Sequence, residues 1–446
     1  MRYLKLFIAL VCFYASSCSN NHDSQEKPDY NPGDIDFVKT FGGTLNDSGK
    51  SIIKTNDGGY AVFGHTQSND LDITNKPDDS FDYWLLKFNQ NDVLEWQKSY
   101  GGSLDDRGTS CILTSDGGYA IFGYSQSSDR DVSENNSATN FWMTKLNTAG
   151  DILWEKSYGF AGSDNGRKVI QTADDGYLLI GDLDVTASGG EGISKFAFSK
   201  LHAGGDYWAI KLNPLGEKQW SHYYGGTFTD TPYDVIQTED LGYLIIGSSD
   251  SDDVDITNNK GSYDFWVVKI NATGTLVWEK SFGGSGIDEA FAITATHDGD
   301  YMIVGDTRSD DLDVTYNHGA ADLWVIKISP DGTLIWEKTY GGTSFDSGRS
   351  ISKTQDQGFL ISGNSRSIDG DVSENKGQND AWIIKIDASG NLIWEKTIGG
   401  SAIDLAFDAI ILNNNNIIAV GESNSSNEDI PSNKGFSDLL LFKLKQ

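Results

Sequence analysis

The chain has 446 residues, with 65 Asp and Glu against 34 Lys and Arg, which gives a formal net charge of −31 at pH 7. This balance argues against nucleic acid as a partner, because phosphates require a basic surface. It also disfavours direct adsorption to anionic lipid. The charge favours solubility, cationic partners or bound metal ions.

The N-terminus has the pattern of an export signal. Residues 2–5 are basic at both ends, and residues 6–15 are almost wholly apolar but too few to span a bilayer as a mature helix. The Ala-Ser-Ser-Cys sequence at 15–18 resembles a lipobox, although Ala15 stands where Leu is usual. We predict a lipoprotein signal peptide over 1–17, palmitate-type lipid on Cys18 and a flexible tether over 18–33. A plain signal peptide with an incidental Cys is the alternative.

One unit of four β-strand patterns recurs seven times after the tether. Each unit opens with a Gly-containing turn, and tight turns separate its strands, as in antiparallel hairpins. The leading glycines are Gly42, Gly101, Gly159, Gly225, Gly283, Gly341 and Gly399. Their spacing places one insertion, within residues 187–204 of the third unit.

The tryptophans reveal how the repeat closes. All of them fall at two positions of the unit, twelve residues apart: Trp84/Trp96, Trp142/Trp154, Trp208/Trp220, Trp266/Trp278, Trp324/Trp336 and Trp382/Trp394. The seventh unit ends before its second position, where Phe37 stands at the other end of the chain. We therefore predict an all-β fold over 34–446, a seven-bladed β-propeller of four-stranded antiparallel blades. Its N-terminal strand, residues 36–41, would complete the last blade.

The repeat resembles two propeller groups. Completion of a four-stranded blade from the N-terminus is similar to WD40-type topology, without that family's Gly-His and Trp-Asp signatures. The stretches at 329–336 and 387–394, each ending Leu-Ile-Trp, resemble the Trp-docking motif of quinoprotein-type propellers. That superfamily includes outer-membrane assembly scaffolds and quinone-dependent dehydrogenases, and the whole repeat resembles secreted bacterial propellers. The resemblance implies the fold and leaves the activity open.

Two charged positions occur in all seven units. One is an Asp after the Gly pair: Asp47, Asp106, Asp164, Asp230, Asp288, Asp346 and Asp404. The other is a mid-strand Lys: Lys87, Lys145, Lys211, Lys269, Lys327, Lys385 and Lys443. The Asp side chains could form a ring that attracts a cation, or close turns by bonding backbone amides. Because a Lys between packed blades needs a partner, we predict repeated structural Lys–Asp pairs.

The loop between the second and third strands has the pattern D-x-D-x-[ST]-x-N-x-G-x-x-D. Oxygen ligands at positions one, three, five and twelve resemble a calcium loop, although the Gly expected at position six is absent. The alternative is a set of Asx and Ser/Thr turns. The calcium candidates are Asp253, Asp255, Asp264, Asp311, Asp313, Asp322, Asp369, Asp371 and Asp380. No other cofactor is indicated.

We find no catalytic constellation, because the six His residues have no metal-ligand spacing and no G-x-S-x-G elbow occurs. The leading interpretation is a non-enzymatic binding or scaffold propeller, anchored by lipid to the outer membrane on its periplasmic side or at the cell surface. Its protein or glycan ligand would meet the acidic loop face near the third-unit insertion, with Phe196, Phe198 and His202. A plain loop extension is the alternative interpretation of that insertion. The alternatives are an extracellular glycan-active enzyme using carboxylates of that face and a quinone-dependent oxidoreductase.

Overall fold

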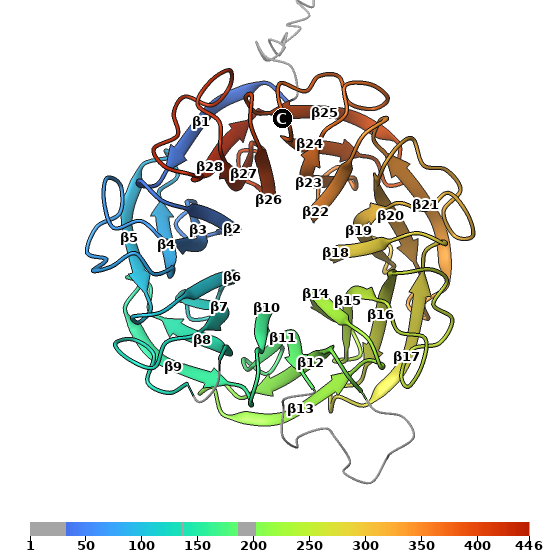
Figure 1. Cartoon of the computed structure of the whole chain (residues 1–446), viewed down its shortest axis with the longest axis horizontal. Coiled ribbons are helices and arrows are strands. Elements are labelled where there is room, and N and C mark those ends of the chain that lie inside the picture. Colours follow the sequence, from blue (N-terminus) through green and yellow to red (C-terminus); the bar gives the residue numbers. More distant parts are fainter. Residues whose placement is uncertain (1–32, 136–137, 186–201, 446) are drawn as a thin grey trace, which may run out of the picture.

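The computed structural model describes residues 33–135, 138–185 and 202–445. Within them, 28 strands form seven antiparallel four-stranded sheets arranged in a ring (Figure 1). The predicted seven-bladed β-propeller is therefore confirmed. Among the described residues, no helix has the length and apolar character needed to cross a membrane.

Each blade is a simple meander from the central channel to the rim. Blades 1 and 2 contain β2 (Asp47–Lys54), β3 (Tyr60–Thr66), β4 (Asp82–Phe88), β5 (Leu94–Tyr100), β6 (Asp106–Leu113), β7 (Tyr119–Ser125), β8 (Asn140–Leu146) and β9 (Ile152–Tyr158). Blades 3 and 4 contain β10 (Asn165–Gln171), β11 (Tyr177–Asp184), β12 (Gly205–Leu212), β13 (Lys218–Tyr224), β14 (Asp230–Gln237), β15 (Tyr243–Ser249), β16 (Asp264–Ile270) and β17 (Leu276–Phe282). Blades 5 and 6 contain β18 (Asp288–Ala295), β19 (Tyr301–Thr307), β20 (Asp322–Ile328), β21 (Leu334–Tyr340), β22 (Asp346–Lys353), β23 (Phe359–Ser365), β24 (Asp380–Ile386) and β25 (Leu392–Ile398). Blade 7 contains β26 (Asp404–Ile411), β27 (Ile417–Ser423), β28 (Asp438–Leu444) and, at the rim, β1 (Ile35–Phe41).

The ring closes through the N-terminal strand, as predicted. Antiparallel pairing places Ile35 opposite Leu444 and Phe41 opposite Leu439. Gly33 donates its backbone N–H to the Lys445 carbonyl oxygen at 2.8 Å. This arrangement leaves no blade incomplete and joins the two ends of the chain.

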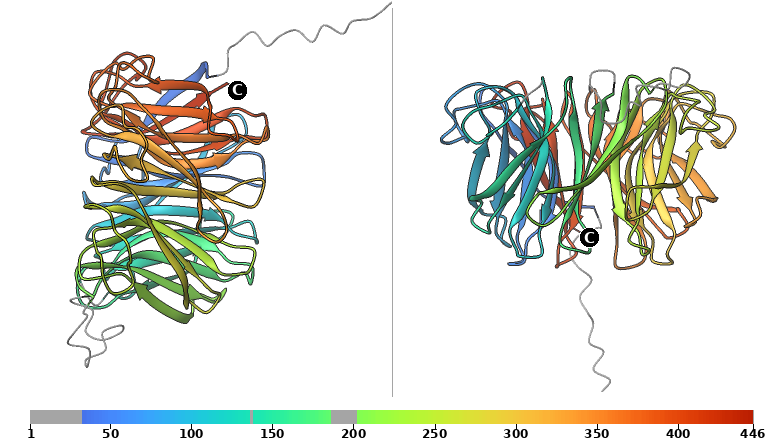
Figure 2. Two further views of the ribbon diagram at one scale, coloured as in Figure 1. Left: turned by 90° about the vertical axis from the view of Figure 1, so that its right-hand side faces the viewer. Right: turned by 90° about the horizontal axis from the view of Figure 1, so that it is seen from below.

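The disc has two distinct faces (Figure 2). The loop face carries the turns that lead into each inner strand, such as Gly42–Gly43, and the loops that join second to third strands. The hairpin face carries the tight turns that join the first strand to the second and the third to the fourth. Because β1 begins opposite the end of β28, the chain enters the propeller at the hairpin face.

The two tryptophans of a unit have different structural roles. The first is buried, and its indole N–H usually donates to a side chain of the rim strand, as Trp266 does to Glu279 at 3.0 Å. The second packs on the turn of the next blade, where the Trp96 ring lies against Gly150 and the Tyr100 hydroxyl donates to the Gly150 carbonyl oxygen at 2.7 Å. Aromatic burial therefore stabilises both the blades and the joints between them.

The predicted pairing of the repeated Lys and Asp residues is wrong. Each Lys instead contacts an Asp in a turn on the hairpin face: Lys87–Asp57, Lys145–Asp116, Lys211–Asp174, Lys269–Asp240, Lys327–Asp298, Lys385–Asp356 and Lys443–Asp92. The repeated Asp residues of the inner strands are fully buried at the loop face. There Asp47 accepts the Gly43 N–H at 2.7 Å and the Ser68 hydroxyl at 2.8 Å. The turn-closing alternative is confirmed for these Asp residues.

Every inner strand carries a β-bulge at the same position. The register skips one residue, which has no partner on the second strand: Lys50, Thr109, Arg167, Tyr233, Phe291, Arg349 and Phe407. A Gly of the second strand lies opposite each bulge, where a Cβ would collide with an inner-strand carbonyl oxygen, as at Gly305 with Glu289. Bulges redirect side chains, and here they turn the seven unpartnered residues toward the channel.

We expect Gly305→Ala to destabilise the protein by about 1–3 kcal/mol or more, because the methyl group must displace backbone. Gly205→Ala is the matched control, since its Cβ would find its nearest neighbour at 3.8 Å. Thermal unfolding of both variants checks the prediction, and equal melting temperatures would contradict it.

Candidate functional site

The mouth of the central channel on the loop face forms a cavity of about 820 Å³. All seven bulged residues line it, together with side chains from the second strands such as His65, Tyr124 and Glu422. We call this cavity the channel pocket. Its volume lies in the range of small-molecule sites.

Four basic side chains line the channel pocket, and each lies over an aromatic ring. The distances from the charged group to the ring centroid are 3.6 Å for Lys50 over Phe407, 3.8 Å for Arg107 over Phe81, 3.8 Å for Arg349 over Phe291 and 5.5 Å for Arg167 over Tyr233. Such contacts favour a fixed position for each cation. The pocket is therefore a basic, aromatic site in a strongly acidic protein.

Three of these cations also contact a carboxylate. The pairs are Lys50–Glu422 at 3.3 Å, Arg107–Asp105 at 3.4 Å and Arg167–Asp182 at 2.8 Å. Glu422 additionally accepts the Ser48 hydroxyl at 2.6 Å. Within the part of the chain that the structure describes, the Arg349 side chain has neither an ion pair nor a hydrogen bond.

Burial dominates the titration of the pocket, and its positive charges add to the effect. Burial lowers the pKa of Lys50; Glu422 opposes this effect, and the charges of Arg349 and Arg107 add to the lowering. Burial also lowers the pKa of His65 to about 3, with Lys50 contributing. His65 is therefore neutral at physiological pH, and its Nδ1 lies 3.2 Å from the Gly108 carbonyl oxygen.

A second, narrower space of about 440 Å³ continues the channel beyond the bulges. It contains the Lys168–Asp234 pair at 3.1 Å. Asp234 accepts the Ile293 N–H at 3.0 Å, and Asp408 accepts the Ile52 N–H at 3.0 Å. These carboxylates join neighbouring inner strands, so this deeper layer has a structural role.

The nine calcium candidates lie on the loop face and bond backbone amides. In blade 4, Asp253 accepts the Thr227 N–H at 3.0 Å and Asp255 the Gly225 N–H at 3.3 Å. Asp311, Asp313, Asp369 and Asp371 make the equivalent bonds in blades 5 and 6. The loops therefore hold the turns that carry the chain from one blade to the next.

The Asp at position twelve of each loop is buried and accepts an N–H from four residues earlier, which occurs for Asp264, Asp322 and Asp380. The residue that donates this N–H is Lys260, His318 or Lys376, and the His318 ring lies 2.5 Å from Asp322. The other oxygen of each of these Asp side chains has no hydrogen-bond partner among residues 33–135, 138–185 and 202–445. Among the described residues, no group of three or more His, Cys, Asp or Glu side chains is placed to hold a metal. Calcium binding stays a prediction.

Calcium binding is checked by thermal unfolding with EGTA and then with millimolar calcium. If the loops hold calcium, the melting temperature rises markedly with the ion, because a ligand that binds only the folded state stabilises it. Magnesium is the matched control ion, and an equal response to both ions would contradict a calcium site.

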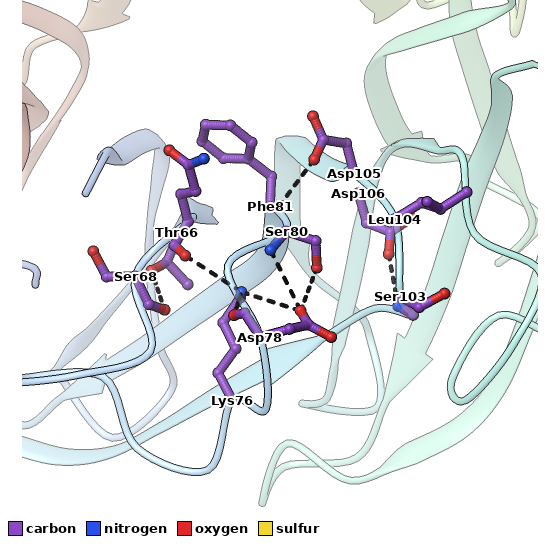
Figure 3. Close-up of polar contacts among 12 residues, drawn as sticks. Thr66, Ser68, Lys76, Asp78, Ser80, Phe81, Ser103, Leu104, Asp105 and Asp106 are labelled. Atoms are coloured by element: carbon purple, nitrogen blue, oxygen red, sulfur yellow. Dashed lines mark hydrogen bonds and ion pairs between the residues drawn. The ribbon is translucent and has the colours of Figure 1, made fainter. Parts of the chain in front are cut away.

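At the junction between blades 1 and 2, the loop from the second to the third strand is longer than its counterparts in blades 4 to 6. Like them, it carries Asp side chains that bond neighbouring groups (Figure 3). Asp78 accepts the Ser80 hydroxyl at 2.6 Å, and Asp105 accepts the Phe81 N–H at 3.2 Å. Asp105 therefore fixes both Phe81 and Arg107, which lies over the Phe81 ring. This loop supports one wall of the channel pocket.

The same junction predicts a pH dependence of stability. Burial raises the pKa of Asp82 to about 7; Asp106 and Asp78 contribute, and Lys76 opposes them. The unfolded value is about 3.9, so between these values the folded chain binds more protons. The contribution of Asp82 to stability is complete below about pH 4 and is lost as the pH rises through about 7.

We therefore expect Asp82→Asn to reduce the fall in melting temperature between about pH 5 and about pH 8. Asn140 occupies the equivalent place in blade 2, so the amide fits this position. The melting temperature of both proteins is measured across this range. An unchanged pH slope in the variant would contradict the assignment.

The third-unit residues proposed from the sequence are only partly described. Phe196 and Phe198 lie outside the described residues. The Nδ1 of His202 is 2.5 Å from Asp206, and its ring packs edge-on against Tyr223. Burial alone would lower the pKa of His202, but the hydrogen bond to Asp206 raises it. None of the residues lining the channel pocket belongs to the described part of this insertion.

The channel residues were not found by the sequence analysis, although a signal was present. The side chain three residues after the repeated Asp differs in size and charge from unit to unit. The side chain at the second-strand position of His65, Tyr124 and Glu422 varies in the same way. Positions that vary within an otherwise regular repeat mark the place where the sevenfold symmetry of the disc is broken.

No protein-family model matches the chain, and no curated protein matches it in sequence. Among solved structures, Sqt1 from Chaetomium thermophilum is similar with a TM-score of 0.47 and 9% identity, over 93% of this chain and 99% of that one. A puromycin hydrolase has a TM-score of 0.47 and 9% identity over 85% of this chain, which spans 50% of the hydrolase. YCF48 bound to D1 peptide has a TM-score of 0.41 and 10% identity, over 94% and 96%.

These similarities carry no activity to this chain. The class of the protein follows from its own strand topology. It is an all-β, seven-bladed β-propeller with a basic, aromatic pocket at the mouth of its channel.

Proposed function

We propose that this protein is an extracytoplasmic binding propeller, anchored to the outer membrane by lipid on Cys18, that takes an anionic ligand into the channel pocket. The observation that carries the proposal is the meeting of Lys50, Arg107, Arg167 and Arg349 in one cavity of a chain with net charge −31. Such a concentration of positive charge on an acidic protein favours an anion at that place.

The energetics of the pocket support an anionic ligand. Burial is the largest cause of the lowered pKa of Lys50 and Glu422 opposes it, while the charges of Arg349 and Arg107 add a smaller repulsion. An anion bound among the cations would relieve it and replace water lost from the guanidinium groups. The acidic loops around the mouth would disfavour binding of the same anion elsewhere on the loop face.

The position of the tether supports an outward-facing pocket. The chain enters at the hairpin face, whereas the channel pocket opens on the loop face. Residues 19–32 separate Cys18 from the propeller and can span at most about 50 Å. A lipid on Cys18 would therefore be joined to the hairpin face, opposite the face on which the pocket opens, and would leave the pocket accessible.

The glycan-active enzyme and the quinone-dependent oxidoreductase stay alternative predictions. The carboxylates that line the channel pocket are Asp47 and Glu422. Both are hydrogen-bonded to neighbouring side chains, and Asp47 is fully buried. No observation on these residues favours acid–base chemistry over binding.

The proposal is tested with the full-length protein in detergent, using citrate, inorganic phosphate and spermidine as probes in thermal-shift measurements. We expect the two anions to raise the melting temperature in a salt-dependent way, and spermidine to have no such effect. The double variant Arg167→Ala/Arg349→Ala should lose the response. Arg366→Ala, on the loop face of blade 6 outside the pocket, should keep it.

Cys18→Ser should move the protein from the membrane fraction to the soluble fraction.

Anion stabilisation that persists in the double variant would place the site elsewhere. Stabilisation by spermidine alone would contradict an anionic ligand, and membrane association of Cys18→Ser would contradict the lipid anchor.

A further inference from the structure

The channel pocket carries cations from three consecutive blades and an aromatic pair from the next two. Passing around the ring of bulged residues, blades 1 and 3 contribute Lys50 and Arg167, and Arg107 joins them from blade 2. Tyr233 and Phe291 follow on blades 4 and 5, with ring centroids 4.8 Å apart in an edge-to-face contact. Arg349 on blade 6 and Phe407 on blade 7 complete the ring, so a ligand that fills the pocket meets both charged groups and aromatic rings.

Arg349 lies beside Phe291 and differs from the other cations. Its guanidinium is 3.8 Å from the Phe291 ring centroid, whereas the other three cations each have a carboxylate within 3.4 Å. Burial raises the pKa of Asp306 to about 6 and the charge of Arg349 opposes this rise, but the two side chains form no ion pair in the described part of the chain. The planar donors of Arg349 are thus available for a bidentate contact with a ligand carboxylate or sulfate.

Neutral polar groups supply a third kind of surface. The Asn46 side-chain amide donates to the side-chain oxygen Oε1 of Gln67 at 2.7 Å, which leaves the side-chain nitrogen Nε2 of Gln67 as a donor toward the pocket. The Tyr124 hydroxyl lines the pocket and makes no hydrogen bond within the described residues. Groups of this kind bind hydroxyl-rich ligands and would be left unsatisfied by an apolar aromatic anion.

These three surfaces discriminate among anions. An inorganic anion would use the cations and leave most of a cavity of about 820 Å³ unfilled. A saccharide uses all three, because its C–H face packs on aromatic rings, its hydroxyls bond amides and phenols, and its acidic groups bond arginine.

Resting on the function proposed above, we propose that the ligand is an acidic oligosaccharide bearing carboxylate or sulfate groups, and that Arg349 binds one of these groups. The aromatic pair Tyr233 and Phe291 supports the sugar ring beside it. Lys50, Arg107 and Arg167 receive a second acidic group on the opposite wall.

The experiment uses the full-length protein in detergent on an array of neutral, uronate-containing and sulfated oligosaccharides, followed by calorimetry. The calorimetric probes are tetragalacturonate, its methyl ester and a chondroitin sulfate tetrasaccharide, which separate carboxylate from sulfate recognition.

We expect array hits to be confined to acidic saccharides. Arg349→Ala should weaken the strongest probe at least tenfold, Arg349→Lys should restore part of the affinity, and Arg366→Ala should change it less than twofold. For a carboxylate ligand, the methyl ester should bind at least tenfold more weakly than the acid.

The contrary outcomes are distinct. Hits among neutral saccharides, equal binding of acid and ester without any sulfate preference, or full affinity in Arg349→Ala would overturn the inference. If citrate or phosphate binds in the channel but no acidic saccharide does, the saccharide assignment fails and the anion-binding function stands. If no anion binds in the channel, the proposed function itself fails.

Discussion

A single backbone irregularity, repeated seven times, determines what the central channel presents. The bulge in each inner strand releases one residue from the alternation of the strand, so that its side chain turns toward the axis instead of packing between blades. The bulge depends on a close approach of the first two strands of the blade, which only Gly permits at positions such as Gly64 and Gly305. The residue at the bulge differs from blade to blade, and it has no partner on the second strand.

Charge is used in two ways in this protein. Pairs that recur in every blade, such as Lys269 with Asp240, lie on the hairpin face and compensate lysines buried between blades. The cations of the channel pocket recur in no regular way, and they meet at the axis, where side chains from all seven blades are brought together. Repeated charges serve the fold, whereas the unrepeated cations gather at one place, the channel pocket.

Much of the architecture was predictable from the sequence, and the site was not. The paired tryptophans and the displaced Phe37 identified the blade number and the closing strand, because aromatic burial at the joints imposes a strict spacing. The partner of the repeated Lys was predicted wrongly, because two Asp positions recur with the same period and spacing cannot tell which face each occupies. Arg349 and Phe291 were missed because the channel brings together residues that lie far apart in the chain. They also occupy positions that differ from unit to unit, whereas the sequence analysis relied on positions that recur.

The route of the chain into the disc also affects how the protein bears load. β1 enters at the hairpin face and runs alongside β28 toward the loop face, with Gly33 seated against the Trp394 ring. Tension on the preceding segment, directed away from that face, pulls β1 along its own length. Its backbone hydrogen bonds stand across this direction and resist together, in shear, instead of opening one after another. The strand that closes the ring is therefore mechanically suited to withstand a pull from its own leading end.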